Sequence, residues 1–262
     1  MDNNRRKLAN RELLKLRYQE REMEQAALKS KSVPVKTLLE KKIPEKVYTG
    51  LESAFCTGFS LVFRQGRKII EKTYKKEEFQ RQHVLRDWKI KTEGSRGDLQ
   101  QMDKSARRSD GRNLAATTAE GIALGAMGVG LPDIVLFLTT LLKGIYESAT
   151  HYGIDYESRE EQYLILKMMS ASLQTGNNWV WENNSVNRFL EAEKPEVTEE
   201  LFQKQLKKTA SAFAVDMLLL KFIQGMPVVG VLGGAANPLY YNKVMKYVAL
   251  KYRKRYLQKQ LK

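Results

Sequence analysis

Hydrophobic positions recur at helical spacing along most of the chain. After Pro44, apolar side chains stand three or four residues apart and form one stripe: Val47, Leu51, Phe55, Phe59, Val62 and Phe63. Such a stripe is typical of a helix that faces a core, and charge replaces it near Lys75. Strand-like alternation is scarce. The pattern therefore predicts an all-α protein, a multi-helix bundle with two Gly/Ala-rich helical hairpins and a long exposed N-terminal helix.

Small residues accompany the stripe on an adjacent face of the same predicted helix. Gly50, Ala54 and Gly58 stand four residues apart. Small side chains at this spacing allow the backbone of a second helix to approach closely. We therefore expect a tightly packed helix pair here.

The first 32 residues differ from the rest. Residues 3–30 are rich in Arg, Glu, Leu and Gln and contain no Gly or Pro, so they predict a helix. Leu13, Leu16 and Met23 form an apolar line that is too thin for a packed core helix. We interpret residues 1–32 as a charged, partner-seeking helical extension, and residues 33–262 as the helical domain.

Two segments predict hairpins rich in small residues. In the first, a Gly/Ala-rich helix from Leu114 leads to a turn at 128–133 and then to an apolar helix that ends at His151, with Gly153 as its cap. In the second, a helix from Thr198 to about residue 224 meets a Gly-Met-Pro break and a Gly/Ala run. Residues 222–242 of this second hairpin carry no charge and could cross a bilayer by length, but their Pro and Gly content argues against a simple span. Both a buried core and insertion into a membrane fit these hairpins.

Weaker signals mark the remaining elements. Asp155 and Ser158 are candidate N-caps of a helix that runs to Leu173. A short element follows at 179–190. Residues 92–112 are polar and rich in Gly, Ser and Asp, so they predict a loop.

Composition adds a strong positive charge. The chain of 262 residues carries 45 Lys and Arg against 30 Asp and Glu, a net charge of +15, which indicates an anionic partner surface. The excess lies in residues 1–32 (nine cations, five acids), 64–91 (ten and four) and 243–262 (eight and none). The segment 119–208 is mildly acidic. A charged start with no apolar run after it predicts a cytoplasmic protein.

The basic C-terminal helix, which Pro238 opens, combines cations with tyrosines. Tyr241, Tyr252 and Tyr256 fall on one side, and the cations cover much of the other: Lys243, Lys246, Arg253, Lys254 and Arg255. A basic helix with a Tyr-bearing apolar face suits the headgroup region of an anionic leaflet. These eight residues are the predicted lipid contacts, although the tyrosines would equally fit a core.

Catalytic patterns are not found. The Gly-rich runs lack the spacing of a phosphate-binding loop. We interpret Cys56 as a buried structural thiol. We expect the His151 imidazole to hydrogen-bond carbonyls at the end of its helix. Asp133 fits a helix first turn, with contact to a headgroup or partner as the alternative. One Cys and two His leave little for a metal centre. We therefore expect no enzyme, no cofactor and no metal.

Three segments in order resemble the EcsC protein family. They are an Ile43-Pro44 start before a Phe-rich helix, the motif at 114–155 and the Pro-Val-Val-Gly run at 227–230 with its Gly-Ala-x-x-Asn-like close. The resemblance covers roughly residues 33–257. The positions that match the hairpin motifs are Gly121, Gly125, Gly130, Pro132, Asp133, Tyr152, Gly153, Asp155, Pro227, Gly230, Gly233, Gly234 and Asn237.

The resemblance implies a bacterial, intracellular, helical protein with a membrane or lipid association, and it carries over no catalytic residue. The family's name comes from a cistron beside an ABC transporter, which makes a membrane transporter complex a candidate partner. Together with the charge pattern, it predicts a non-enzymatic protein peripheral to the inner face of the cell membrane. The alternative is a soluble helical interaction module without lipid contact. Nucleic acid is disfavoured because no recognisable binding motif is found.

Overall fold

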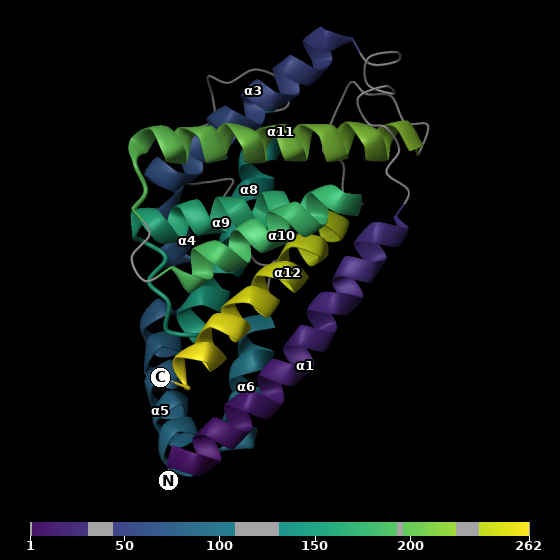
Figure 1. Ribbon diagram of the computed structural model, residues 1–262. Coiled ribbons are helices and arrows are strands. Elements are labelled where there is room, and N and C mark those ends of the chain that lie inside the picture. The colour runs from purple at the N-terminus through teal and green to yellow at the C-terminus, as the bar shows by residue number, and fades with distance from the viewer. Residues whose placement is uncertain (1, 31–43, 108–130, 193–195, 224–235, 262) are drawn as a thin grey trace.

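The fold is described by a computed structural model, which defines residues 2–30, 44–107, 131–192, 196–223 and 236–261 (Figure 1). These ranges are almost entirely helical and contain no strand, which confirms the all-α prediction. The helices are α1 (Asp2–Lys29), α3 (Glu45–Leu61), the π-turn η1 (Val62–Gly66), α4 (Arg67–Lys72), α5 (Lys76–Glu93), α6 (Arg96–Arg107), α8 (Leu131–His151), α9 (Arg159–Leu173), α10 (Gly176–Glu191), α11 (Glu199–Ile223) and α12 (Ala236–Lys259). Within the described ranges, no helix is both long and apolar enough to cross a bilayer.

The predicted Phe stripe forms part of the core. Phe55 and Phe59 of α3 are fully buried and pack against Phe213 of α11, with ring centroids 5.4 and 5.9 Å apart. Gly58 lies against Ile134 of α8, where a Cβ would come within 3.1 Å of the Ile134 side chain. The expected close approach of a second helix is therefore confirmed at Gly58.

The C-terminal helix α12 is a central element of the bundle. It packs against α1, α8, α9 and α6. In Figure 1 its yellow ribbon runs beside that of α1. Tyr247, Val248 and Tyr252 are completely or almost completely buried. Neighbours on several sides leave α12 without a broad solvent-facing surface.

Helix α1 packs along α12 and is not a separate extension. Leu13 and Leu16, the thin apolar line of the sequence, are buried together with Ala9 and Glu12. The buried face is narrow because acidic side chains complete it through ion pairs with α12. The helix is long and exposed on its other face, as predicted, but its role as an extension outside the domain was wrong.

The polar segment 92–112 was also misread, because α6 occupies Arg96–Arg107 within it. Ser95 caps this helix: the backbone N–H of Asp98 donates to its hydroxyl at 3.3 Å. Leu99, Met102 and Ala106 stand at helical spacing and are buried. Three apolar residues suffice here because one side of a short helix faces the core.

Several predicted boundaries are confirmed. Gly153 ends α8 with a left-handed backbone (φ +66°), and Ser158 caps α9 by accepting a hydrogen bond from the N–H of Glu161. The element predicted at 179–190 is the longer helix α10.

Much of the two predicted hairpins lies outside the described residues. This holds for Gly121, Gly125, Gly130, Pro227, Gly230, Gly233 and Gly234. Pro132 and Asp133 begin α8, and Asn237 lies in the first turn of α12. A core or membrane role of the hairpins stays a prediction.

Candidate functional site

The predicted lipid-contact face of α12 points into the protein. Tyr252 and Tyr256 are buried, and so is the guanidinium of Arg253. The prediction that these side chains form an exposed basic and aromatic face was therefore wrong. A helical wheel shows the two sides of α12 correctly, but it does not show that other helices cover both.

Acidic side chains of α1 neutralise the cations of α12. Glu20 accepts from Lys251 Nζ at 2.5 Å and from Lys254 Nζ at 3.0 Å. Burial alone would raise the pKa of Glu20, but these ion pairs outweigh it and lower the pKa to about 2. Burial lowers the pKa of Lys251 to about 8, against the opposing attraction of Glu20.

A second ion-pair group joins α12 to three other elements. Arg253 Nη2 lies 2.6 Å from Glu12 Oε2 on α1 and 2.9 Å from Asp103 Oδ2 on α6. The hydroxyl of Tyr152, a residue of the family-like motif, donates to Asp103 at 2.9 Å. Arg255 pairs with the buried Glu161 of α9. Arg253, Lys254 and Arg255 are thus committed to internal contacts.

The remaining predicted lipid contacts line a groove between α1 and α12 of about 880 Å³. Tyr241 and Lys243 are half-buried, and Lys243 Nζ lies 3.3 Å from the carbonyl of Leu173 and 3.6 Å from Asp216 Oδ1. Lys246 is the one exposed residue of the eight predicted contacts, so the set does not form one surface.

The motif residues 152–155 serve as the platform on which α5 docks. His83 Nδ1–H of α5 donates to the backbone carbonyl of His151 at 2.9 Å. Gly153 lies against the same imidazole, and a Cβ at position 153 would overlap it. The His151 ring stacks on Phe79 with centroids 4.4 Å apart. His151 was expected near helix-terminal carbonyls; instead its ring packs on an aromatic residue and its own carbonyl is the acceptor.

Burial shifts both imidazoles toward the neutral form. Desolvation lowers the pKa of His151 to about 4, and the positive charge of Arg86 adds to the effect. Desolvation also lowers the pKa of His83. Neither ring therefore carries a charge near neutral pH, which suits a packed seam between two helices.

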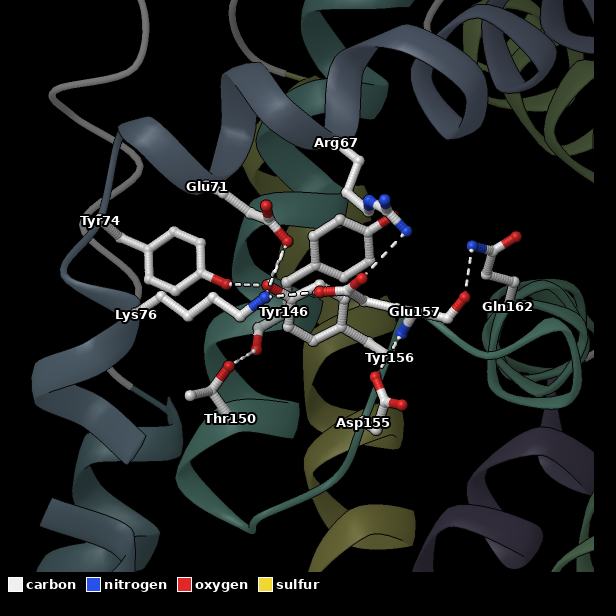
Figure 2. Close-up of polar contacts among 10 residues, drawn as sticks. All are labelled: Arg67, Glu71, Tyr74, Lys76, Tyr146, Thr150, Asp155, Tyr156, Glu157 and Gln162. Atoms are coloured by element: carbon white, nitrogen blue, oxygen red, sulfur yellow. Dashed lines mark hydrogen bonds and ion pairs between the residues drawn. The ribbon is translucent and has the colours of Figure 1, made fainter. Parts of the chain in front are cut away.

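Figure 2 shows the polar cluster that extends this platform to the start of α5. Lys76 Nζ bridges Glu71 at 2.9 Å and Glu157 at 2.7 Å. Tyr156 donates to Glu71 at 2.9 Å and lies 2.6 Å from the hydroxyl of Tyr74. The cluster ties the junction of α4 and α5 to the chain after α8.

Two further contacts in Figure 2 hold the platform itself. The Tyr146 and Tyr156 rings stack with centroids 4.3 Å apart and planes 9° from parallel. Asp155 Oδ1 accepts from the backbone N–H of Glu157 at 2.9 Å, so the motif carboxylate shapes the turn. These contacts join α4, α5 and the turn after α8, so the cluster positions these elements against one another.

The outer faces of α1 and α5 are the most exposed apolar surfaces of the described residues. Together they carry six of the ten large hydrophobic side chains that are exposed there: Leu14, Tyr18 and Leu28 on α1, and Val84, Leu85 and Trp88 on α5. Helix α1 lies within the basic segment 1–32, and α5 overlaps the basic segment 64–91. This surface was not predicted from the sequence, although Trp88 within a basic segment is a signal that could have indicated it.

Two smaller cavities are formed by the described residues. A groove of about 530 Å³ between α3, η1 and α11 contains Cys56, which is half-buried, and burial raises the pKa of its thiol. A pocket of about 400 Å³ contains Tyr152, Gly153 and Asp155. Among the described residues, no cluster of His, Cys, Asp and Glu is arranged to hold a metal ion.

An all-α bundle whose Tyr-Gly-x-Asp turn positions a neighbouring helix fits the family that the sequence resembles. The sequence model of the EcsC protein family matches residues 7–257. The chain belongs to this family. The match includes nearly all of α1, in agreement with the packing of that helix. Searches of curated proteins and of solved structures gave no match.

Proposed function

We propose that this protein is a non-enzymatic peripheral membrane protein that binds an anionic leaflet on the cytoplasmic side. The outer face of α1 is the observation that supports this proposal most directly. Its exposed residues follow a spacing of four and three: Lys7, Arg11, Leu14, Tyr18, Arg21, Gln25 and Leu28. Leu14 and Tyr18 are 63% and 66% exposed.

This face has the composition that the sequence had indicated for α12. Leu14 and Tyr18 supply apolar and aromatic contact. The exposed side chains of Arg11, Arg17 and Arg21 stand beside them. A helix of this kind lies in the plane of a membrane interface, where each cation near an anionic leaflet contributes about 1 kcal/mol. Two acids of α1, Glu12 and Glu20, point inward to α12. Glu22 is exposed next to Arg21, so cations outnumber acids on the outer face but do not exclude them.

The test is sedimentation of the full chain with vesicles of phosphatidylglycerol and phosphatidylcholine, compared with phosphatidylcholine alone. We expect binding to the anionic vesicles that weakens with salt. The variant Arg11→Glu/Arg17→Glu/Arg21→Glu should bind more than about tenfold more weakly, because each lost cation costs about 1 kcal/mol.

A matched control changes the net charge equally on other helices. Lys204→Glu/Lys207→Glu/Lys246→Glu alters three exposed lysines of α11 and α12. It should retain most of the binding. Equal losses in both variants would show a net-charge effect without a defined face. A protein that stays in the supernatant with every vesicle would favour the soluble interaction module.

A further inference from the structure

The second exposed surface, on α5, is a compact apolar patch. Val84, Leu85 and Trp88 are 65%, 65% and 59% exposed. Trp88 stands four residues after Val84 and three after Leu85, so its side chain neighbours both on the helix surface. Exposing a Trp, a Leu and a Val side by side to water costs free energy, which points to a partner that covers them.

Hydrogen bonds attach the inner side of α5 to the rest of the bundle, so the patch on its other side faces solvent. His83 binds the carbonyl of His151, and Asp87 Oδ1 accepts from Tyr256 at 2.9 Å and from Gln260 at 3.0 Å. Ile90 is buried. The motif turn after α8 and the end of α12 therefore hold α5 with its patch outward.

The charges nearest the patch are mainly positive. Arg81 and Lys89 are exposed within one turn of it, and Lys91 pairs with Asp87. The acids lie farther away, with Glu77 and Glu78 toward the start of α5 and the exposed Glu93 at its end. An apolar patch between cations is complementary to an anionic bilayer, with acyl chains below a layer of phosphates.

The patch and the basic face of α1 belong to neighbouring helices. Gly94, which caps α5, packs against Asn4 near the start of α1. Two weak contacts on adjacent elements reinforce each other because the second binds at a high effective concentration. Neither face needs to bind strongly alone.

We infer that the patch on α5 enters the interface of an anionic membrane, with the Trp88 ring at headgroup depth and Leu85 and Val84 against the acyl chains. This inference rests on the proposed function and specifies which side chains leave water. It uses the preference of Trp for the membrane–water interface. Helix α1 then supplies most of the electrostatic attraction, and α5 supplies the insertion.

Tryptophan fluorescence tests insertion directly because the chain has three Trp residues. Trp88 on α5 and Trp181 on α10 are both 59% exposed, and Trp179 is buried. Trp181 lies 4.8 Å from Lys208 Nζ, on a different helix from the patch. Trp88→Phe and Trp181→Phe therefore form a matched pair.

The measurement uses anionic vesicles whose acyl chains carry bromine near the headgroup end. In the wild type and in Trp181→Phe, we expect a blue shift and quenching of the emission. In Trp88→Phe both effects should be lost while sedimentation continues. Quenching that persists in Trp88→Phe, or sedimentation without quenching in any form, would overturn the inference but leave the proposed function standing. No sedimentation of the wild type would overturn both.

A second pair of variants tests the contribution of the patch to affinity. Leu85→Ala/Trp88→Ala should weaken vesicle binding at least about tenfold, because two large apolar side chains no longer leave water. Trp181→Ala/Leu201→Ala removes two exposed apolar side chains elsewhere and should change binding little. Circular dichroism melts confirm that each variant is folded. Equal effects of the two pairs would contradict the assignment.

Discussion

Lys251 of α12 and Glu20 of α1 form a buried ion pair, with Nζ 2.5 Å from Oε1 and the lysine side chain fully enclosed. This pair explains why the most basic part of the sequence is unavailable to an anionic partner. It also ties the N-terminal helix to the bundle. The consequences can be measured in the free energy of unfolding.

Removal of one partner should leave an uncompensated buried charge. We expect Glu20→Gln and Lys251→Met each to lower the free energy of unfolding. The loss should be about 3–5 kcal/mol for Glu20→Gln, because the charge of the fully buried Lys251 then loses its partner. The double variant should cost less than the sum, because neither charge then stands alone. Urea unfolding of the four proteins measures the coupling. Additive losses would mean that the pair contributes no specific interaction.

Gly153 should resist substitution because its backbone is left-handed and its Cα faces His83. Gly153→Ala adds about 1–2 kcal/mol of backbone strain, and overlap with the imidazole adds more. Gly50→Ala is the control, since Gly50 lies inside α3 with open space around its Cα. It should stabilise the protein by up to about 1 kcal/mol. Similar melting temperatures for the two variants would count against the docking role of the motif turn.

Stability should fall in mild acid because His151 is buried in its neutral form. Its pKa is about 4 in the folded chain, below the usual 6.5, so the folded state binds fewer protons than the unfolded state below pH 6.5. The contribution of His151 is complete above pH 6.5 and is lost as the pH falls toward 4. Between about pH 7 and about pH 5 the expected loss is about 2 kcal/mol.

The variant His151→Phe separates this effect from other titrating groups. A phenyl ring can keep the stack on Phe79 and has no proton to gain. The wild type should lose about 2 kcal/mol more stability than the variant over the same pH range. Parallel losses in the two proteins would assign the acid sensitivity to other groups, such as His83.

Deletion of residues 243–262 is not a test of lipid binding by the C-terminal helix. The deletion would remove Val248 and Tyr252 from the core. It would also take Arg253 away from Glu12 and Lys251 away from Glu20. We expect the truncated chain to lose its cooperative thermal transition, as measured by circular dichroism. A truncated protein that melts cooperatively near the wild-type temperature would contradict the central position of α12.

Local signals in the sequence predicted local structure well. The Phe stripe, the Gly153 cap and the Ser158 cap all depend on residues within a few positions of one another. Helix α6 was missed because its polar composition concealed Leu99, Met102 and Ala106. In a short helix, three core-facing residues are a weak signal against many polar ones.

The orientation of α12 could not be read from its own sequence. A helix with cations and tyrosines suits a membrane surface unless acids from elsewhere neutralise it. Two of those acids, Glu12 and Glu20, lie more than 230 residues away in the chain from the cations they pair with. The same pairing turns the arginines of α1 outward. One tertiary contact thus moved the predicted membrane face from α12 to α1 and α5.

Lysine footprinting on vesicles tests the location of this face most directly. The native chain is acetylated in solution and when bound to phosphatidylglycerol vesicles, and the modified lysines are quantified by mass spectrometry. We predict protection of Lys7 and Lys89 on vesicles, unchanged reactivity of Lys204 and Lys207, and no reaction of the enclosed Lys251 in either state. Protection of Lys204 and Lys207 with Lys7 and Lys89 still reactive would contradict the account.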